Sequence, residues 1–130
     1  MSTRTNIPAR TPWAEVLGYS RAVVLDGRIH VAGTLPVDEA GALVGGTDAG
    51  QQTRQVLKII EAALHEAGAT PQDVVRTRIY LRDFADLDAI AAVHLEFFGA
   101  IRPACTIAQV GLSDPAYLVQ MDADAVIRAS

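Results

Sequence analysis

Hydrophobic and polar positions change their period several times along this chain, which is typical of a domain that mixes strands with helices. The stretch RAVVLDGRIHVAGTLPV (21–37) contains two β-branched runs joined by Asp26 and Gly27. This dipeptide suits a tight hairpin turn because both central positions of such a turn take positive φ. We therefore expect a hairpin here, followed by a further short strand in ALVGG (42–46).

Two amphipathic helices are predicted from the spacing of apolar residues and from their boundary residues. The first helix begins after an N-cap at Thr47 or Asp48 and ends at Gly68. Its apolar positions are Val56, Ile59, Ile60, Ala63 and Leu64. The second helix runs from Asp86 to Phe98, before Gly99. Its expected inward positions are Leu87, Ile90, Ala91, His94 and Phe97 or Phe98.

Three more strands complete the pattern. VVRTRIYLRD (74–83) alternates with period two, and its predicted core side is Val75, Thr77, Ile79 and Leu81. ACTIAQV (104–110) and YLVQMDADAVI (117–127) follow, separated by a turn signal at 113–115. This order predicts an α+β sandwich in which one mixed sheet carries both helices on one face, as a single domain spanning residues 1–130.

The other face of the sheet is predicted to be polar. On the last strand Gln120, Asp122 and Asp124 alternate with apolar residues. A polar face flanked by apolar positions favours identical subunits that meet around a hydrated axis. Asp122 and Asp124 also resemble a carboxylate pair that could bind a metal ion, but exposure to solvent along that axis is the preferred interpretation.

Composition narrows the functional classes. Lys and Arg total 11 against 15 Asp and Glu, the net charge is −4, and no basic run occurs, so a nucleic acid is not expected as the main partner. One cysteine rules out an internal disulfide and a Cys-based zinc site, and the three histidines lack ligand spacing. No metal or cofactor is expected. No apolar run reaches the roughly 18 residues of a membrane helix, and the N-terminus lacks a signal-peptide core, so we expect a cytoplasmic protein without membrane contact.

Five segments carry a resemblance to a known family. GYSRAV, VAGTLPVD, DVVRTRIYLRDFADL, FFGAIRPACT and DADAVI are similar, in order and spacing over residues 12–128, to the Rid superfamily (reactive intermediate deaminases, also called YjgF-like). The resemblance implies a chorismate-mutase-like subunit, a homotrimer, and small-molecule clefts between neighbouring subunits. In the well-studied branch these clefts hydrolyse imines or enamines released from amino acids by pyridoxal-phosphate dehydratases, without a metal or cofactor of their own.

The resemblance also implies site positions at which this chain departs from that branch. An arginine after the Pro-Ala pair binds the substrate carboxylate, and here that position is Cys105. A glutamate in the last strand positions the attacking water, and here it is Gln120. Other cleft positions are Ala32 for a serine, Ala91 for an asparagine, Ile107 for a cysteine, and Tyr19, which matches the family's aromatic residue.

The loss of the arginine and the acid should weaken binding of a small imino acid. One charged hydrogen bond of this kind contributes about 1.5–3 kcal/mol, which corresponds to about tenfold to a hundredfold in affinity. Arg102 could replace the missing arginine only if the chain bends at Pro103, because one position along a strand reverses the face.

Two residues allow both a functional and a structural interpretation. Cys105 could be a nucleophile activated by His30, which should share a face with Ala32, or it could be a small buried apolar side chain. His94 is interpreted as a hydrogen-bonded packing residue, with a functional role as the alternative.

Three functions remain after these steps. The favoured function is a Rid-type enzyme with a more apolar cleft, which acts on a larger or uncharged imine or enamine and uses Gln120 to orient water. The second is a binding or regulatory trimer that keeps the cleft but performs no chemistry. The third is cleavage of RNA, which has been ascribed to some relatives and which the acidic charge balance opposes.

Overall fold

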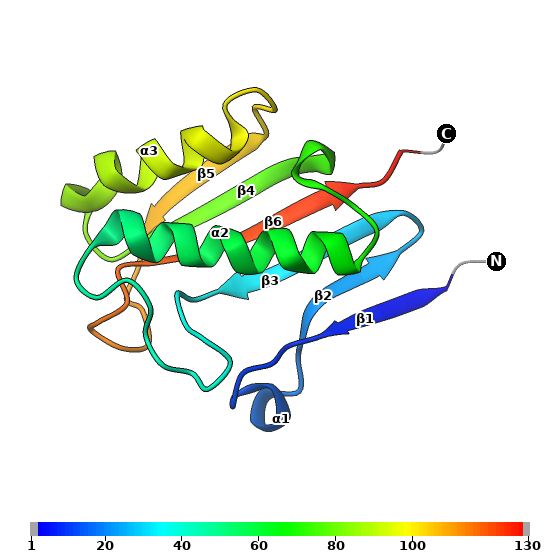
Figure 1. Ribbon diagram of the computed structural model, residues 1–130, viewed down its shortest axis with the longest axis horizontal. Helices are drawn as coiled ribbons and strands as arrows, with labels where there is room; N and C mark the ends of the chain where they lie inside the picture. Colours follow the sequence, from blue (N-terminus) through cyan, green and yellow to red (C-terminus); the bar gives the residue numbers. More distant parts are fainter. Residues whose placement is uncertain (1–2, 129–130) are drawn as a thin grey trace.

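Six strands form one mixed sheet in the computed structural model, which describes residues 3–128 (Figure 1). In chain order the strands are β1 (Arg4–Pro8), β2 (Ser20–Leu25), β3 (Arg28–Thr34), β4 (Val74–Leu81), β5 (Ala104–Gln109) and β6 (Val119–Val126). Their order across the sheet is β1-β2-β3-β6-β4-β5. All neighbouring pairs are antiparallel except β4 and β5, which are parallel.

Both long helices cover one face of this sheet (Figure 1). The helices are α1 (Ala14–Leu17), α2 (Ala49–Glu66) and α3 (Leu87–Phe98), with short 3-10 turns η1 (Pro71–Asp73) and η2 (Phe84–Asp86). Helix α2 packs over β2, β3 and β6 and contacts α3. Helix α3 is the crossover that the parallel pair β4 and β5 requires. The predicted α+β sandwich with two helices on one face is confirmed.

The β2–β3 hairpin and the start of α2 form as their residues predict. Asp26 and Gly27 have φ values of 53° and 74°, the left-handed conformation that a two-residue turn needs. Asp48, not Thr47, is the N-cap of α2, and its carboxylate accepts a hydrogen bond from the backbone N–H of Gln51 at 3.1 Å. The helix therefore begins at the residue whose side chain binds a backbone N–H that has no partner within the helix.

The core lies between the helices and the sheet. Apolar side chains from every second position of the central strands meet one stripe of each helix. The largest fully buried members are Ile29, Leu57, Ile60, Leu64, Ile79, Leu81, Ile90 and Met121. Alternate residues of β6 are buried and half-buried, as predicted, so the other face of the sheet is left to polar side chains.

Several predicted details are wrong. Segment 42–46 forms only an isolated bridge from Leu43 to Val37, with no strand. Val75 is 49% exposed because the register between β4 and β6 shifts next to it, and Val74 is buried in its place. In the helices Ile59 is only half-buried and Ala91 is exposed, since the buried stripes use Leu57 and Val93 instead.

The N-terminal elements β1 and α1 were not predicted. Only one residue of β1, Ile7, is buried, so the strand lacks an apolar alternation. Helix α1 has four residues, none of them buried. Four terminal positions of the predicted domain, 1–2 and 129–130, lie outside the described residues.

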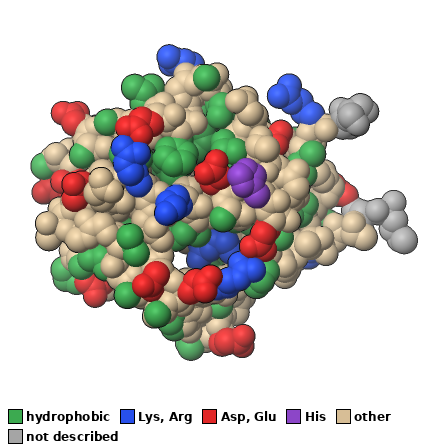
Figure 2. Space-filling model, viewed as in Figure 1, with side chains coloured by type: hydrophobic (Ala, Val, Ile, Leu, Met, Phe, Trp, Pro, Cys, Tyr) green, Lys and Arg blue, Asp and Glu red, His purple; other side chains and the backbone are tan. Residues whose placement is uncertain are grey.

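The helix-covered side is hollowed beside α2. Figure 2 views this side and shows basic side chains within the hollow and acidic ones around it. The hollow corresponds to a cavity of about 360 Å³ between α2, β1, β2 and the segment after β3.

Candidate functional site

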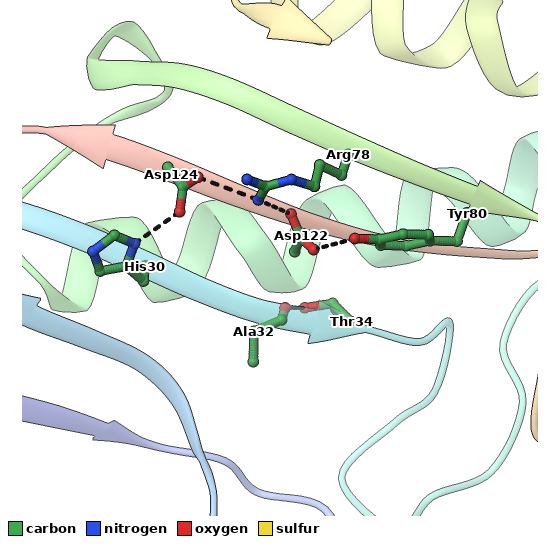
Figure 3. A network of polar contacts seen from close by, with 7 residues as sticks. All are labelled: His30, Ala32, Thr34, Arg78, Tyr80, Asp122 and Asp124. Carbon is green, nitrogen blue, oxygen red and sulfur yellow. Dashed lines mark hydrogen bonds and ion pairs between the residues drawn. The ribbon is translucent and has the colours of Figure 1, made fainter. Parts of the chain in front are cut away.

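A chain of charged side chains crosses the uncovered face of the sheet (Figure 3). Arg78 on β4 donates from Nη1 to Asp122 Oδ1 at 3.1 Å and to Asp124 Oδ2 at 3.3 Å, so one guanidinium bridges both carboxylates of β6. Tyr80 donates its hydroxyl to Asp122 Oδ2 at 2.8 Å. On the other side, Nδ1 of His30 lies 2.8 Å from Asp124 Oδ1. Three strands therefore contribute to one polar network.

Both acids of β6 have protein partners in this network. Asp122 and Asp124 keep only 19% and 26% of their side-chain surface, and each has two partners. Burial, and then the hydrogen bond to Asp122, raise the pKa of the Tyr80 phenol above its ordinary value, so that it remains a donor. Within residues 3–128 no group of three or more His, Cys, Asp or Glu side chains could hold a metal ion.

Gln120 lies at one end of this face, on β6 opposite Tyr80. Its amide is half-buried and has no hydrogen-bond partner among the described residues. An open depression beside it is lined by Tyr80, Gln120 and the loop residues 110–113. The amide rests on Gly33, since a Cβ added there would lie 2.8 Å from Gln120 Nε2. An unpaired amide beside a depression can bind a water molecule or a polar ligand.

Tyr19 is connected to this position through Arg21. The Tyr19 hydroxyl lies 2.8 Å from Thr11 Oγ1 and accepts a hydrogen bond from Arg21 Nη2 at 3.3 Å. Arg21 Nη1 donates to the carbonyl of Gly33 at 3.1 Å and to Thr34 Oγ1 at 3.0 Å. The predicted aromatic residue and the glycine beneath Gln120 are thus joined by one buried arginine.

The other predicted residues lie at the far edge of the sheet. Cys105 and Ile107 are on the edge strand β5, and both are exposed. In the register they pair with Thr77 and Ile79, so they share the helix-covered face, whereas Gln120 shares the opposite face with Tyr80. Within one chain, the edge-strand residues and Gln120 do not form a common site.

Two expectations for Cys105 are therefore corrected. Within one chain it is exposed and not a buried apolar side chain, because β5 is an edge strand. Nor can His30 activate it within one chain, because β6 and β4 separate their strands and His30 contacts Asp124 instead. Ala32 is half-buried on β3, next to the polar network. Arg102 is exposed and takes a φ of 55°, so the chain does bend before Pro103.

His94 has the packing role expected from its position. Its Nε2 lies 2.9 Å from the hydroxyl of the fully buried Thr77, and its ring is 4.8 Å from that of Phe98. Burial lowers the pKa of this imidazole below its ordinary value. The structure gives His94 no contact with the polar face.

Three contributors were missed by sequence reasoning: Arg78, Tyr80 and Arg21. The signal for the first two was present, because they alternate with Thr77, Ile79 and Leu81 and so had to lie on the opposite face. Finding them required the pairing of β4 with β6, which the sequence pattern alone does not give. Arg21 was hidden in a strand that appeared simply apolar.

No helix in the described part of the chain is both long and apolar enough to cross a membrane.

Comparisons with known proteins agree with the architecture. The family described as endoribonuclease L-PSP matches residues 10–127. The 3-aminoacrylate deaminase RutC of Acinetobacter baylyi is 40% identical over 115 residues, which cover 88% of this chain and 90% of that protein. The solved structure of Rv2704 from Mycobacterium tuberculosis, a member of the YjgF/YER057c/UK114 family, is 40% identical, with a TM-score of 0.87 over 96% of this chain and 100% of that one.

A more distant structure supports the same conclusion. The YjgF gene product of Escherichia coli is 26% identical and superposes with a TM-score of 0.82 over 95% of this chain and 99% of that one. The family match covers most of the sequence, and the two solved structures superpose on this chain with TM-scores of 0.87 and 0.82. This chain therefore belongs to the Rid superfamily of YjgF-like proteins.

Proposed function

We propose that this protein hydrolyses imines or enamines to a carbonyl compound and ammonia, in a cleft that is more apolar than that of the arginine-bearing Rid enzymes. The observation that carries the proposal is the half-buried Gln120 amide, which has no partner in the described chain and lies beside an open depression. The 40% identity to a protein named 3-aminoacrylate deaminase RutC supports the reaction class.

The cleft is proposed to form between two copies of the chain in a homotrimer. Gln120 and Ala32 lie on one face of the sheet, while Cys105 and Ile107 lie at the β5 edge and share the other face. A single chain cannot bring these residues together, but a neighbouring copy can place its edge strand against the polar face. The exposure of β5, with Ile107 38% exposed, fits an edge that awaits such a partner.

The proposed reaction needs only water and proton transfer. An enamine first becomes its imine tautomer, water adds to the imine carbon, and the carbinolamine then loses ammonia as the carbonyl forms. Gln120 can orient the water, because its amide both accepts and donates hydrogen bonds. It cannot exchange a proton as a carboxyl group does, so the proton must reach the leaving nitrogen through water.

Small carboxylate substrates are proposed to be poor ones. Cys105 offers no cation at the position where the resemblance places the carboxylate-binding arginine, and Gln120 offers no acid. Arg102 is exposed and has a φ of 55°. It can replace the carboxylate-binding arginine only if a neighbouring copy of the chain contacts it. Substrates that are larger or lack a carboxylate depend less on the missing arginine and acid, so their binding is weakened less.

A non-catalytic binding trimer is the second candidate, favoured by the same absence of an acid at position 120. Cleavage of RNA is the activity in the description of the matching family. The net charge of −4 opposes it, because affinity for nucleic acid depends on neutralising phosphates.

The test uses 2-aminoacrylate, generated by a serine dehydratase and trapped with semicarbazide, with 3-aminoacrylate in a parallel assay. We expect deamination that is weak beside that of an arginine-bearing relative, and weaker still in Gln120→Leu. A rate equal to that of the relative would show that the altered positions do not control the site. If the protein accelerates neither of these reactions nor the hydrolysis of an uncharged imine, the binding trimer remains as the function.

A further inference from the structure

Arg21 is a buried cation without a counter-ion. Its residue surface is 7% exposed, yet all its hydrogen-bond partners are neutral oxygens, those of Tyr19, Gly33 and Thr34. It takes part in no ion pair among the described residues. A buried charge is costly unless an opposite charge or a full set of hydrogen bonds compensates it. This arginine has only part of that compensation.

Two N–H donors of the Arg21 guanidinium are unused. A guanidinium has five N–H donors, and three are used here, two on Nη1 and one on Nη2. The Nε–H and the second Nη2–H remain, on two adjacent nitrogens. No buried side-chain nitrogen within residues 3–128 lacks a partner, so the unpaired Nε is accessible rather than sealed in protein. Two adjacent N–H groups match the two oxygens of a carboxylate.

Arg21 lines a cavity, and an irregularity of the backbone lies beside it. The register between β1 and β2 shifts at Ile7 and Pro8, and Arg21 is the residue of β2 left without a partner. Such an irregularity re-aims a side chain. Arg21 accordingly lines the cavity of about 360 Å³ beside α2, the hollow visible in Figure 2. This cavity is on the helix-covered face, whereas the Gln120 depression is on the opposite face.

The other lining residues define the chemistry of a ligand. The walls are largely apolar, with Leu35, Val37 and Ile59 among them. Among the other charged lining residues, Arg10 pairs with Glu66 at 2.9 Å and Asp38 accepts hydrogen bonds from two backbone N–H groups of its own loop. Glu39 and Lys58 also line the cavity and form no ion pair among the described residues. Acidic groups in the lining disfavour a multiply charged anion such as phosphate. A singly charged anion with an apolar body fits.

The geometry points to a second small-molecule site in this cavity, one that binds a monocarboxylate with an apolar body through the Nε and Nη2 fork of Arg21. The site lies within one chain and is separate from the proposed catalytic cleft. Its occupant would touch Arg21, which in turn holds Tyr19 and the carbonyl of Gly33, the residue on which the Gln120 amide rests.

The test is an NMR titration of the ¹⁵N-labelled full chain with 3-phenylpropanoate and with the neutral 3-phenylpropanamide. We expect saturable shifts of the Arg21 Nε–H signal and of the Leu35 and Val37 amides with the acid, and an affinity at least about tenfold lower for the amide. Equal affinities for acid and amide, or no saturable shift, would overturn the proposal, and this comparison needs no variant.

Three variants sharpen the result. Arg21→Gln keeps an N–H donor in the side chain but removes the charge and should abolish selectivity for the acid. Arg21→Lys keeps the charge without the fork and should bind the acid more weakly than the parent. Arg54→Gln makes the same charge change at an arginine paired with Glu96 outside the cavity and should bind like the parent. Acid binding that persists unchanged in folded Arg21→Gln would refute the assignment.

Discussion

Gly33 sets the position of the Gln120 amide, because there is no room for a Cβ between them. An alanine Cβ at position 33 would lie 2.8 Å from Nε2 and 3.3 Å from Cδ of Gln120. The clash is with the end of a flexible side chain, so the fold should tolerate it while the amide moves away. The glycine is thus a positioning residue for the proposed water-binding group.

We predict that Gly33→Ala remains folded but loses most of its imine hydrolysis. Gly111→Ala is the matched control, since Gly111 also lines the depression and an added Cβ there would meet nothing within 4 Å. Thermal unfolding and initial rates should be measured for both variants. Equal rates for the two would mean that the placement of Gln120 does not matter for the reaction.

His94 makes stability depend on pH through burial. Its pKa in the folded protein lies below the ordinary value of about 6.5, so the fold favours the neutral ring. Stability is therefore fully present above about pH 6.5 and decreases as the pH falls from there toward the folded-state pKa. The unfolded chain takes up the proton first, and this drives the loss.

The prediction concerns the difference in unfolding free energy between the parent and His94→Gln, which keeps a group able to bond Thr77. This difference should shrink between pH 7.5 and pH 5 in urea titrations. A difference for His94→Gln that stays constant over this range would show that the fold does not favour the neutral form of this half-buried imidazole.

At the scale of elements, Gln52 connects helix α2 to the loop that lines the depression. It is fully buried, and its Nε2 donates to the carbonyls of Gly46 at 2.8 Å and Ala116 at 2.9 Å. Its Oε1 accepts from the backbone N–H of Leu118 at 2.8 Å. One side chain thus satisfies three backbone groups on two segments far apart in sequence.

Gln52→Met should lower the free energy of unfolding by about 2–4 kcal/mol, because it leaves these backbone groups without their partner at nearly constant volume. Gln51→Met, at the exposed neighbouring position, should change it by less than about 0.5 kcal/mol. Chemical denaturation measures both variants. A small loss for Gln52→Met would mean that water replaces the amide and that the loop is not held from α2.

Alternation and boundary residues predicted most elements, but not the positions that depend on strand pairing. Period two gave the sides of β6 correctly, because no irregularity interrupts its burial pattern. The same rule misplaced Val75, because the register shift beside it arises from pairing with β6. It also missed β1, which is too short and polar to show a pattern and forms by pairing with β2. Local sequence does not encode such partners.

For the whole molecule, the candidate site could be predicted only in part. The resemblance identified Tyr19, Cys105 and Gln120, but the structure separates Cys105 from Gln120 by face as well as by strand. Within a single chain, Cys105 and Gln120 therefore have separate surroundings. The buried Arg21 escaped prediction because its burial follows from a register irregularity and not from its neighbours in sequence.

A homotrimer with clefts between subunits makes a direct prediction about mixtures. Cys105→Arg alone and Gln120→Glu alone should deaminate 2-aminoacrylate little better than the parent, since a clamp without an acid only binds and an acid without a clamp lacks a positioned substrate. Subunits of the two variants, unfolded and refolded together, should gain activity, because some clefts then contain both groups. The double variant in one chain should be more active still.

Sedimentation should accompany this experiment and give three times the 13.8 kDa chain mass for every variant. A stable monomer at micromolar concentration would remove the trimer and its clefts. If the double variant is active but the mixture of single variants is not, the two residues act within one chain, contrary to their placement on opposite faces.

The central claim is that the altered cleft favours imines that lack a carboxylate. Its most direct measurement compares two imines with the same side chain: the one released from phenylalanine by an amino-acid oxidase, which carries a carboxylate, and the one released from phenethylamine by an amine oxidase, which does not. Semicarbazide trapping gives the rate of each hydrolysis with and without the protein. We expect greater acceleration for the uncharged imine, diminished in Gln120→Leu. Greater acceleration for the carboxylate imine, or none for either, would contradict the claim.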